Sequence, residues 1–233
     1  MSLVPQRGDI KHAMKAAIRR NGQKPCSVCG KPRYSLSQYC VHHWMRYRNT
    51  GHHNGKHYPI RFFESEIKEI RTIIRINRNH KLVLDALATI DTILYTAGVK
   101  HLPNIPRRGN RYVAGVYQWV QEGQLTTTDI LAVLGGMTLK NFREDGLFKS
   151  DKHFEYSIAL KFLKSKYGLF NKKFGGRGNR DIASPILRPL GRMLWDKLGY
   201  SLVRLYHAAN DRAKENQNIN KIIPADAPLV TQD

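Results

Sequence analysis

The segment from Cys26 to His43 constrains the fold of this chain more than any other stretch. Cys26 and Cys29 form a Cys-x2-Cys pair, and after ten intervening residues Cys40 and His43 form a Cys-x2-His pair. These two pairs contain all three cysteines of the 233 residues. Zinc takes four soft or borderline ligands in a tetrahedron, and two short pairs supply two ligands each. The spacing therefore predicts a Zn²⁺ site built from Cys26, Cys29, Cys40 and His43.

Two alternatives to this ligand set stay open at the level of the sequence. His42 is a second candidate for the fourth ligand, although the two-residue spacing favours His43. The cysteines could also be three buried thiols beside an unrelated histidine, but chance would seldom leave no cysteine outside the pattern. Gly30 supplies the backbone freedom that a turn between such ligands usually needs. Because four protein ligands leave no open coordination position, the zinc is expected to be structural.

The residues after the second pair resemble a known module. Residues 40–51 read Cys-x2-His-Trp-x-Arg-x-Arg-x2-Gly, which is similar to the small zinc finger of many phage-encoded proteins, including some HNH endonucleases. In that family a tyrosine usually follows the histidine, and here Trp44 takes its place. The resemblance covers residues 26–51. It implies a zinc finger in a protein encoded by a phage or mobile element and acting in the host cytoplasm.

Net charge is the second strong feature of the sequence. Lysine and arginine total 39 against 18 acidic residues, which gives a formal charge of +21. The excess peaks in residues 1–61, where 12 basic residues accompany a single acid, Asp9. A chain this basic repels itself unless a polyanion is near, so nucleic acid is the expected partner, with DNA favoured over RNA. A solubilising surface, an anionic lipid surface and an acidic host protein or nucleoprotein machine are the alternatives.

The cysteine pattern and the hydropathy indicate where such a chain would reside. Cysteines placed as metal ligands are typical of a reducing compartment. No run of 18 apolar residues predicts a membrane span, and the N-terminal segment lacks the apolar core of a secretory signal. We therefore expect a soluble, cytoplasmic protein without a membrane partner.

Basic residues near aromatic rings or flexible glycines are the candidate nucleic-acid contacts, because cations neutralise phosphates and rings stack on bases. Four of these basic residues lie within the finger, two follow Gly135-Gly136, and four lie in the Gly-rich loop 171–180. The loop could equally be an ordinary surface loop. The candidates are Lys31, Arg33, Arg46, Arg48, Lys140, Arg143, Lys172, Lys173, Arg177 and Arg180.

A cluster of imidazoles follows the finger and raises an enzymatic alternative. His52, His53, Asn54 and His57 would be the catalytic residues if the chain were an HNH-like, metal-dependent nuclease, since that chemistry needs a histidine base and further metal ligands. The nuclease motif draws these groups from positions tens of residues apart, whereas here they crowd between Gly51 and a proline. A basic loop without catalytic residues is the expected state, and a non-enzymatic regulator or accessory factor is the expected function.

The rest of the sequence predicts a mainly α protein, in which the small finger precedes a bundle-like helical body. Apolar residues recur at three- and four-residue steps along most segments after Phe63. The expected organisation is a basic segment 1–61 containing the finger 26–51, a helical hairpin 62–102, a linker 103–111, a helical domain 112–216 and a flexible tail 217–233.

Residues 128–144 match a helix-turn-helix pattern. Thr128 would cap a first helix, Gly135-Gly136 would form the turn, and a second helix would present Lys140 and Arg143 to a DNA groove. Ordinary packing of helices within the bundle is the expected state, and the helix-turn-helix is the alternative. Gly199 is likewise expected to separate two helices near the end of the chain.

Overall fold

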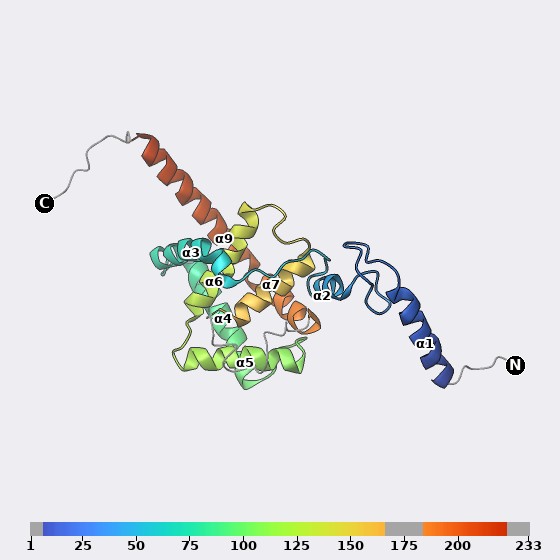
Figure 1. Cartoon of the computed structure of the whole chain (residues 1–233). Coiled ribbons are helices and arrows are strands. Elements are labelled where there is room, and N and C mark those ends of the chain that lie inside the picture. Colours follow the sequence, from blue (N-terminus) through green and yellow to red (C-terminus); the bar gives the residue numbers. More distant parts are fainter. Residues whose placement is uncertain (1–6, 166–183, 223–233) are drawn as a thin grey trace.

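The computed structural model describes residues 7–165 and 184–222. Within these residues the chain forms eight α-helices, one short 3-10 helix and no strand, so the prediction of a mainly α protein with an N-terminal Cys/His segment is confirmed (Figure 1). Helix α1 spans Arg7–Gly22 and α2 spans Val41–Thr50. Together with the loop between them they extend from one side of the helical body (Figure 1).

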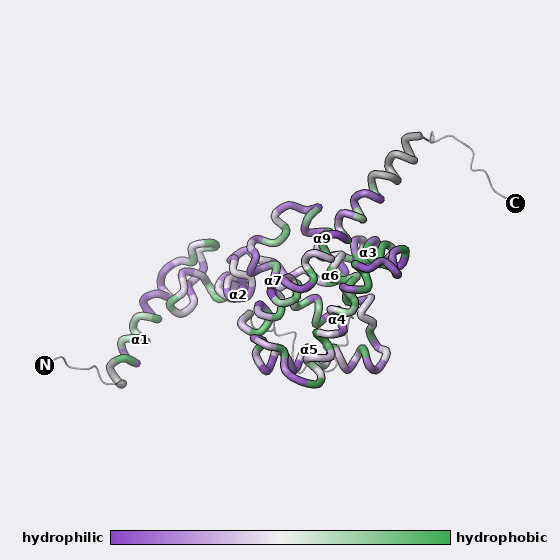
Figure 2. Tube along the Cα trace, turned by 180° about the vertical axis from the view of Figure 1, so that it is seen from behind, coloured by the Kyte–Doolittle hydropathy of each residue, from purple (hydrophilic) through white to green (hydrophobic). Residues whose placement is uncertain are grey.

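Six further α-helices and the 3-10 helix η1 make up the body. The apolar residues gather here, and hydrophilic residues dominate the N-terminal extension (Figure 2). The elements are η1 (Ile60–Phe63), α3 (Glu64–Ile76), α4 (Lys81–Val99), α5 (Arg107–Gln121), α6 (Thr127–Arg143), α7 (Asp151–Leu163) and α9 (Ser184–Ile222).

Helix α6 lies at the centre of the body. Ten consecutive residues, from Ile130 to Leu139, are buried, and the helix packs against α3, α9, α4 and α7. Its two glycines let α3 approach closely. A Cβ on Gly136 would lie 2.8 Å from the Cα of Ile67, and one on Gly135 would lie 2.8 Å from Cγ2 of Ile70. Glycine is therefore required here for packing between helices.

The helix-turn-helix prediction is wrong for this region. Helix α6 runs unbroken from Thr127 to Arg143 through both glycines. Its cap is Thr126, whose hydroxyl oxygen accepts a hydrogen bond from the Asp129 backbone N–H at 3.0 Å. Burial against α3 stabilises the helical conformation at the two glycines, whose low helix propensity had suggested a turn.

The predicted hairpin over residues 62–102 is also replaced by other pairings. Helix α3 packs mainly on α6, and α4 packs mainly on α5. The proposed linker 103–111 is shorter than expected, because α5 begins at Arg107. The buried side chain of Asn110 explains this early start: its Oδ1 accepts from the Leu102 N–H at 2.9 Å and its Nδ2 donates to the Ala97 carbonyl at 3.2 Å. These bonds join the end of α4 to the first turn of α5.

Helix α9 continues where the sequence suggested a break and a tail. It runs from Ser184 through Pro189 and Gly199 to Ile222. Gly199 is buried, and a Cβ there would meet the ring of Trp195 at 3.2 Å, so this glycine favours packing and does not end the helix. Residues 217–222, expected to be a loose tail, belong to α9. Residues 223–233 and the Gly-rich loop, with Lys172, Lys173, Arg177 and Arg180, lie outside the described residues.

Among the described helices, α4 is the one long and apolar enough to cross a membrane by length and composition. Six of its residues are buried in the body, where the helix packs against α5, α6 and α9. Asp85 and Thr92 lie exposed on its other side. One side of α4 therefore packs in the body and the other side is exposed.

Candidate metal centre

The first ligand pair lies in a tight turn that its backbone hydrogen bonds define. The Cys26 N–H donates to the Lys31 carbonyl at 2.7 Å, and the Gly30 N–H donates back to the Cys26 carbonyl at 3.0 Å. Gly30 has a φ of 71°, in the left-handed region where a side chain would be strained. The turn directs the sulfur atoms of Cys26 and Cys29 to the same side.

The second pair lies at the start of α2. Cys40 is the residue before the helix, in extended conformation, and His43 lies in the first turn. The Trp44 N–H donates to the Cys40 carbonyl at 2.8 Å, which fixes this turn. Three residues along a helical turn bring two side chains to one face, so Cys40 and His43 point together toward the first pair.

The four predicted ligands converge. Their ligand atoms all lie within 4.8 Å of one another, and we call this group the Cys₃His cluster. Nδ1 of His43 lies 3.6 Å from the Cys26 sulfur and 3.4 Å from the Cys40 sulfur, and the sulfurs of Cys29 and Cys40 are 3.7 Å apart. Ligands at tetrahedral angles around zinc, with Zn–S near 2.3 Å and Zn–N near 2.0 Å, are separated by about 3.5–3.8 Å. The cluster therefore has the size of a tetrahedral metal site.

The lowered pKa of one thiol, that of Cys26, also suits a cation. Burial raises the pKa of Cys26, but hydrogen bonds from the backbone of Cys40, Val28 and Cys29 and from the His43 side chain outweigh it and lower that pKa to about 5. At Cys29 a backbone hydrogen bond from Lys31 acts to lower the pKa, yet burial and the neighbouring sulfurs raise it overall. Adjacent thiolates repel one another, and a divalent cation between them removes that repulsion.

A miniature core surrounds the cluster. Cys26, Tyr39 and Cys40 are buried, and Val28 and Trp44 pack against them. Trp44 therefore contributes to the core of the finger. Arg46 and Arg48 lie on an α-helix, two residues apart, so their side chains diverge as helical geometry requires.

The histidines of the possible nuclease site are not arranged as metal ligands. His52 and His53 stack with ring centroids 4.4 Å apart, and Nδ1 of His52 accepts a hydrogen bond from the Asn54 N–H at 3.1 Å. His57 instead lies against the ring of Tyr156 in the body. In the part of the chain that the structure describes, the Cys₃His cluster is the one group of three or more His, Cys, Asp or Glu residues with ligand atoms this close.

Helix α7 binds the backbone of residues 50–58, the segment that follows the finger and that we call the finger exit. The residues responsible were not predicted from the sequence. Ser150, at the start of the helix, donates its hydroxyl to the Thr50 carbonyl at 2.9 Å. Nε2 of His153 lies 2.8 Å from the Lys56 carbonyl oxygen. Further along, the ammonium of Lys161 donates to the Tyr58 carbonyl. The carbonyl acceptors are backbone atoms, so no residue pattern in segment 50–58 marks them.

Two of these α7 side chains are buried ionisable groups. Burial lowers the pKa of His153 to about 4, with positive charge at His57, His52 and Lys149 acting in the same direction. Burial also lowers the pKa of Lys161 to about 8, with Lys164 contributing. Lys161 is only 5% exposed. It reaches the backbone of the finger exit and lies over the Phe63 ring at 5.8 Å.

Lys140 and Arg143, expected to face a DNA groove, instead connect α6 to α3. Nζ of Lys140 lies 2.9 Å from Glu144 and 3.2 Å from Glu66, and these carboxylates raise its pKa. Arg143 forms a bidentate ion pair with Glu69, in which Nη1 lies 2.7 Å from Oε2 and Nη2 lies 2.8 Å from Oε1. Acids already balance both cations, so they are poor candidates for phosphate contacts.

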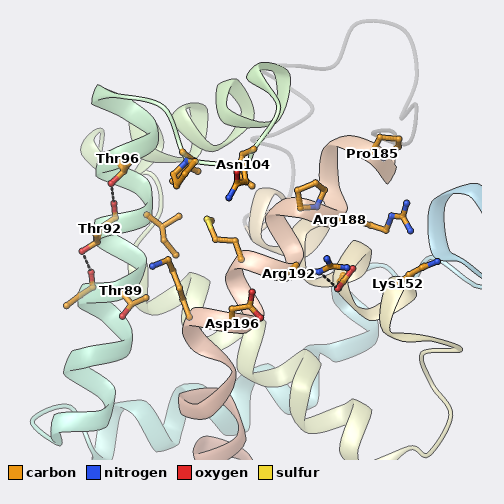
Figure 3. A pocket seen from close by; sticks show the side chains of 18 of the residues that line it. Thr89, Thr92, Thr96, Asn104, Lys152, Pro185, Arg188, Arg192 and Asp196 are labelled. Carbon is orange, nitrogen blue, oxygen red and sulfur yellow. Dashed lines mark hydrogen bonds and ion pairs between the residues drawn. The ribbon is translucent and has the colours of Figure 1, made fainter.

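A large open cavity of about 1480 Å³ lies on the body, between α4 and α9 (Figure 3). Thr89, Thr92 and Thr96 of α4 form one wall, and each donates its hydroxyl to the carbonyl four residues earlier. On α9, Arg192 donates to the Glu155 carboxylate at 2.9 Å. The charged residues of the lining are Lys152, Arg188, Arg192 and Lys197, with Asp85, Glu155 and Asp196 as acids.

Comparison of the chain with models of known protein families, with curated proteins and with solved structures finds no significant match.

Proposed function

We propose that this chain is a zinc-finger protein that binds nucleic acid, with DNA preferred to RNA, and that it acts as a non-enzymatic regulator or accessory factor. The observation that carries the proposal is the Cys₃His cluster inside the most basic part of the chain. Its donor set of three sulfurs and one imidazole nitrogen suits Zn²⁺ among the biological cations. The resemblance of residues 26–51 to the fingers of phage endonucleases favours DNA.

In this proposal zinc is a structural ion. Cys26, Cys29, Cys40 and Nδ1 of His43 would hold it, and it would join the turn at Gly30 to the first turn of α2. The two parts contribute only a small apolar core of their own. Small modules of this kind depend on metal binding for their folded state.

Exposed cations around the cluster would provide the affinity. Lys11, Lys15 and Arg19 recur every four residues along α1, so they share one face of the helix, and all three are exposed. No ion pair within the described residues involves them. A row of cations without acidic partners matches a phosphate backbone better than a neutral surface. Arg46 and Arg48 of α2 add exposed positive charge on the other side of the cluster.

The proposal is tested by binding of the zinc-loaded, full-length protein to labelled duplex DNA, single-stranded DNA and RNA. Affinity for duplex DNA should fall steeply between roughly 50 and 200 mM salt if several phosphates are contacted. Replacing both Lys11 and Lys15 by Gln should reduce the slope of log affinity against log salt by about two. The matched control is Arg75→Gln, in the last turn of α3, combined with Arg78→Gln, just after that helix.

The same reactions, run with and without Mg²⁺ and resolved on a denaturing gel, separate the alternatives. Intact strands agree with the proposal. Cut strands that become intact after His53→Ala would point to the nuclease. Absence of binding to every nucleic acid would overturn the proposal and favour a host protein as the partner.

A further inference from the structure

A shallow depression beside the Cys₃His cluster combines cations with an exposed aromatic ring. It measures about 390 Å³, within the range of about 300–1,000 Å³ that pockets for small ligands occupy. It contains no acidic residue, in contrast to the mixed charges of the large cavity on the body. The lining consists of Lys31, Pro32, Arg33, Tyr34, Cys40, Val41 and His42.

Tyr34 gives the depression a rigid ring. Its centroid lies 4.9 Å from that of Trp44, at an interplanar angle of 46°, so one side of the tyrosine rests on the finger core. The guanidinium of Arg48 lies over the Trp44 ring at 5.4 Å. Tyr34 nevertheless remains 43% exposed. An aromatic ring that is supported on one side and open on the other is a stacking surface.

The backbone around Tyr34 is held in place by several bonds. Its N–H donates to the Tyr39 carbonyl at 2.8 Å, and its carbonyl accepts from the Ser37 N–H at 3.0 Å. Ser35 has a φ of 53°, a left-handed conformation that non-glycine residues seldom adopt. The side chain of Asn21, in α1, donates to the carbonyls of Ser35 and Ser37 at 2.6 and 2.8 Å. Strained conformations that are held this way concentrate at binding sites.

The cations of the depression are available to an anion. Nε of Arg33 donates to the Pro25 carbonyl at 2.8 Å, which orients the guanidinium and leaves its two terminal nitrogens as donors. Lys31 is exposed. No ion pair in the described part of the chain involves either residue. An oriented guanidinium beside an ammonium is suited to a phosphate group.

A flat ring beside a phosphate is the chemistry of a nucleotide. In a duplex both faces of a base are covered by its neighbours, so only an unpaired base can stack on a protein ring. We infer that this depression binds one unpaired nucleotide of a nucleic-acid strand, with the base on Tyr34 and the adjoining phosphate on Lys31 and Arg33. This inference rests on the proposed nucleic-acid function and specifies which structural form of the polymer the finger recognises.

The test compares a single-stranded DNA oligonucleotide with a duplex of the same sequence, using the zinc-loaded, full-length protein and fluorescence anisotropy. Tyr34→Ala should weaken single-strand binding by about tenfold and leave duplex binding within about twofold. Tyr34→Phe, which keeps the ring, should bind as the wild type does. Tyr95→Ala removes another exposed tyrosine, on α4, and is the matched control.

A single 2-aminopurine placed along the strand reports stacking directly. Its fluorescence should be quenched by the wild type and by Tyr34→Phe at one position, and quenching should be lost in Tyr34→Ala at unchanged zinc content. Equal losses on single strand and duplex, or no loss from Tyr34→Ala, would overturn the inference while leaving nucleic-acid binding intact. Failure of the wild type to bind either form would overturn the proposed function and this inference together.

Discussion

Nε2 of His153 lies 2.8 Å from the carbonyl oxygen of Lys56, and Nδ1 of the same ring accepts the Lys149 N–H at 3.1 Å. These two bonds require the neutral imidazole with its proton on Nε2. The ring is fully buried. A second proton on Nδ1 would face an N–H group, so the contact between α7 and the finger exit depends on the neutral form.

Acidification should therefore weaken this contact. Because the pKa of His153 is about 4 in the folded protein and near 6.5 in the unfolded chain, the unfolded chain binds more protons between those values. The free energy of unfolding should fall as pH drops from about 6.5 to about 4, by up to about 3 kcal/mol from this group. Urea denaturation of wild type and His153→Gln at a series of pH values, with zinc in excess, measures it. Parallel curves for the two proteins would contradict the assignment.

Lys161 should change the free energy of unfolding in the same direction as His153, but in an alkaline pH range. Its pKa is about 8 in the folded protein against about 10.5 in the unfolded chain, so the unfolded chain binds more protons between those values. The free energy of unfolding therefore rises with pH across this window, as the cost of burying the charge is removed. Relative to Lys161→Met, which has no such charge, the wild type should gain about 3 kcal/mol between pH 7 and pH 10.5. A constant difference would show that the ammonium is not buried in solution.

The close contact between α6 and α3 predicts a strong effect of one methyl group. Gly136→Ala should lower the free energy of unfolding by about 2 kcal/mol, because its Cβ would overlap the backbone of Ile67. This loss occurs although alanine is the better helix former by about 1 kcal/mol. Gly22→Ala, where the nearest atom to the added Cβ is 3.8 Å away, should be neutral or slightly stabilising. Thermal unfolding of both variants provides the comparison.

Metal content tests the cluster directly. Cys29→Ser should lose about one equivalent of zinc, measured by elemental analysis of protein purified without chelators, and should expose residues 26–43 to proteolysis. His42→Ala should retain the metal, since His43 supplies the imidazole nitrogen near the sulfurs. Loss of zinc from His42→Ala, or full retention in Cys29→Ser, would show that the ligand set is wrong.

The ligand set could be predicted from the sequence because it is local. Cys26, Cys29, Cys40 and His43 lie within 18 residues, and their spacing alone places two ligands on each of two turns. The helical character of the body was equally evident, since apolar periodicity is a local property as well.

Partners that are distant in the sequence could not be predicted in this way. Gly135 and Gly136 have low helix propensity, and only the contact with α3, more than 60 residues away, shows why they remain helical. Lys140 and Arg143 were interpreted as groove-facing cations because two of the acids that pair with them, Glu66 and Glu69, lie on α3. Only Glu144, the other partner of Lys140, is close in the sequence. The hydrogen bonds from α7 to the finger exit could not be predicted, because their acceptors are backbone carbonyl groups, which every residue has.

The hydrogen bonds from Ser150, His153 and Lys161 to the backbone of residues 50–58 fix the orientation of the finger relative to the helical body. A finger joined by a loose tether would have to lose orientational entropy each time its cations and those of the body met one ligand. In this protein the finger loses that orientational entropy during folding, so binding does not have to offset it again. Mutations in the middle of α7, far from any expected nucleic-acid contact, should therefore alter affinity for long ligands more than for short ones.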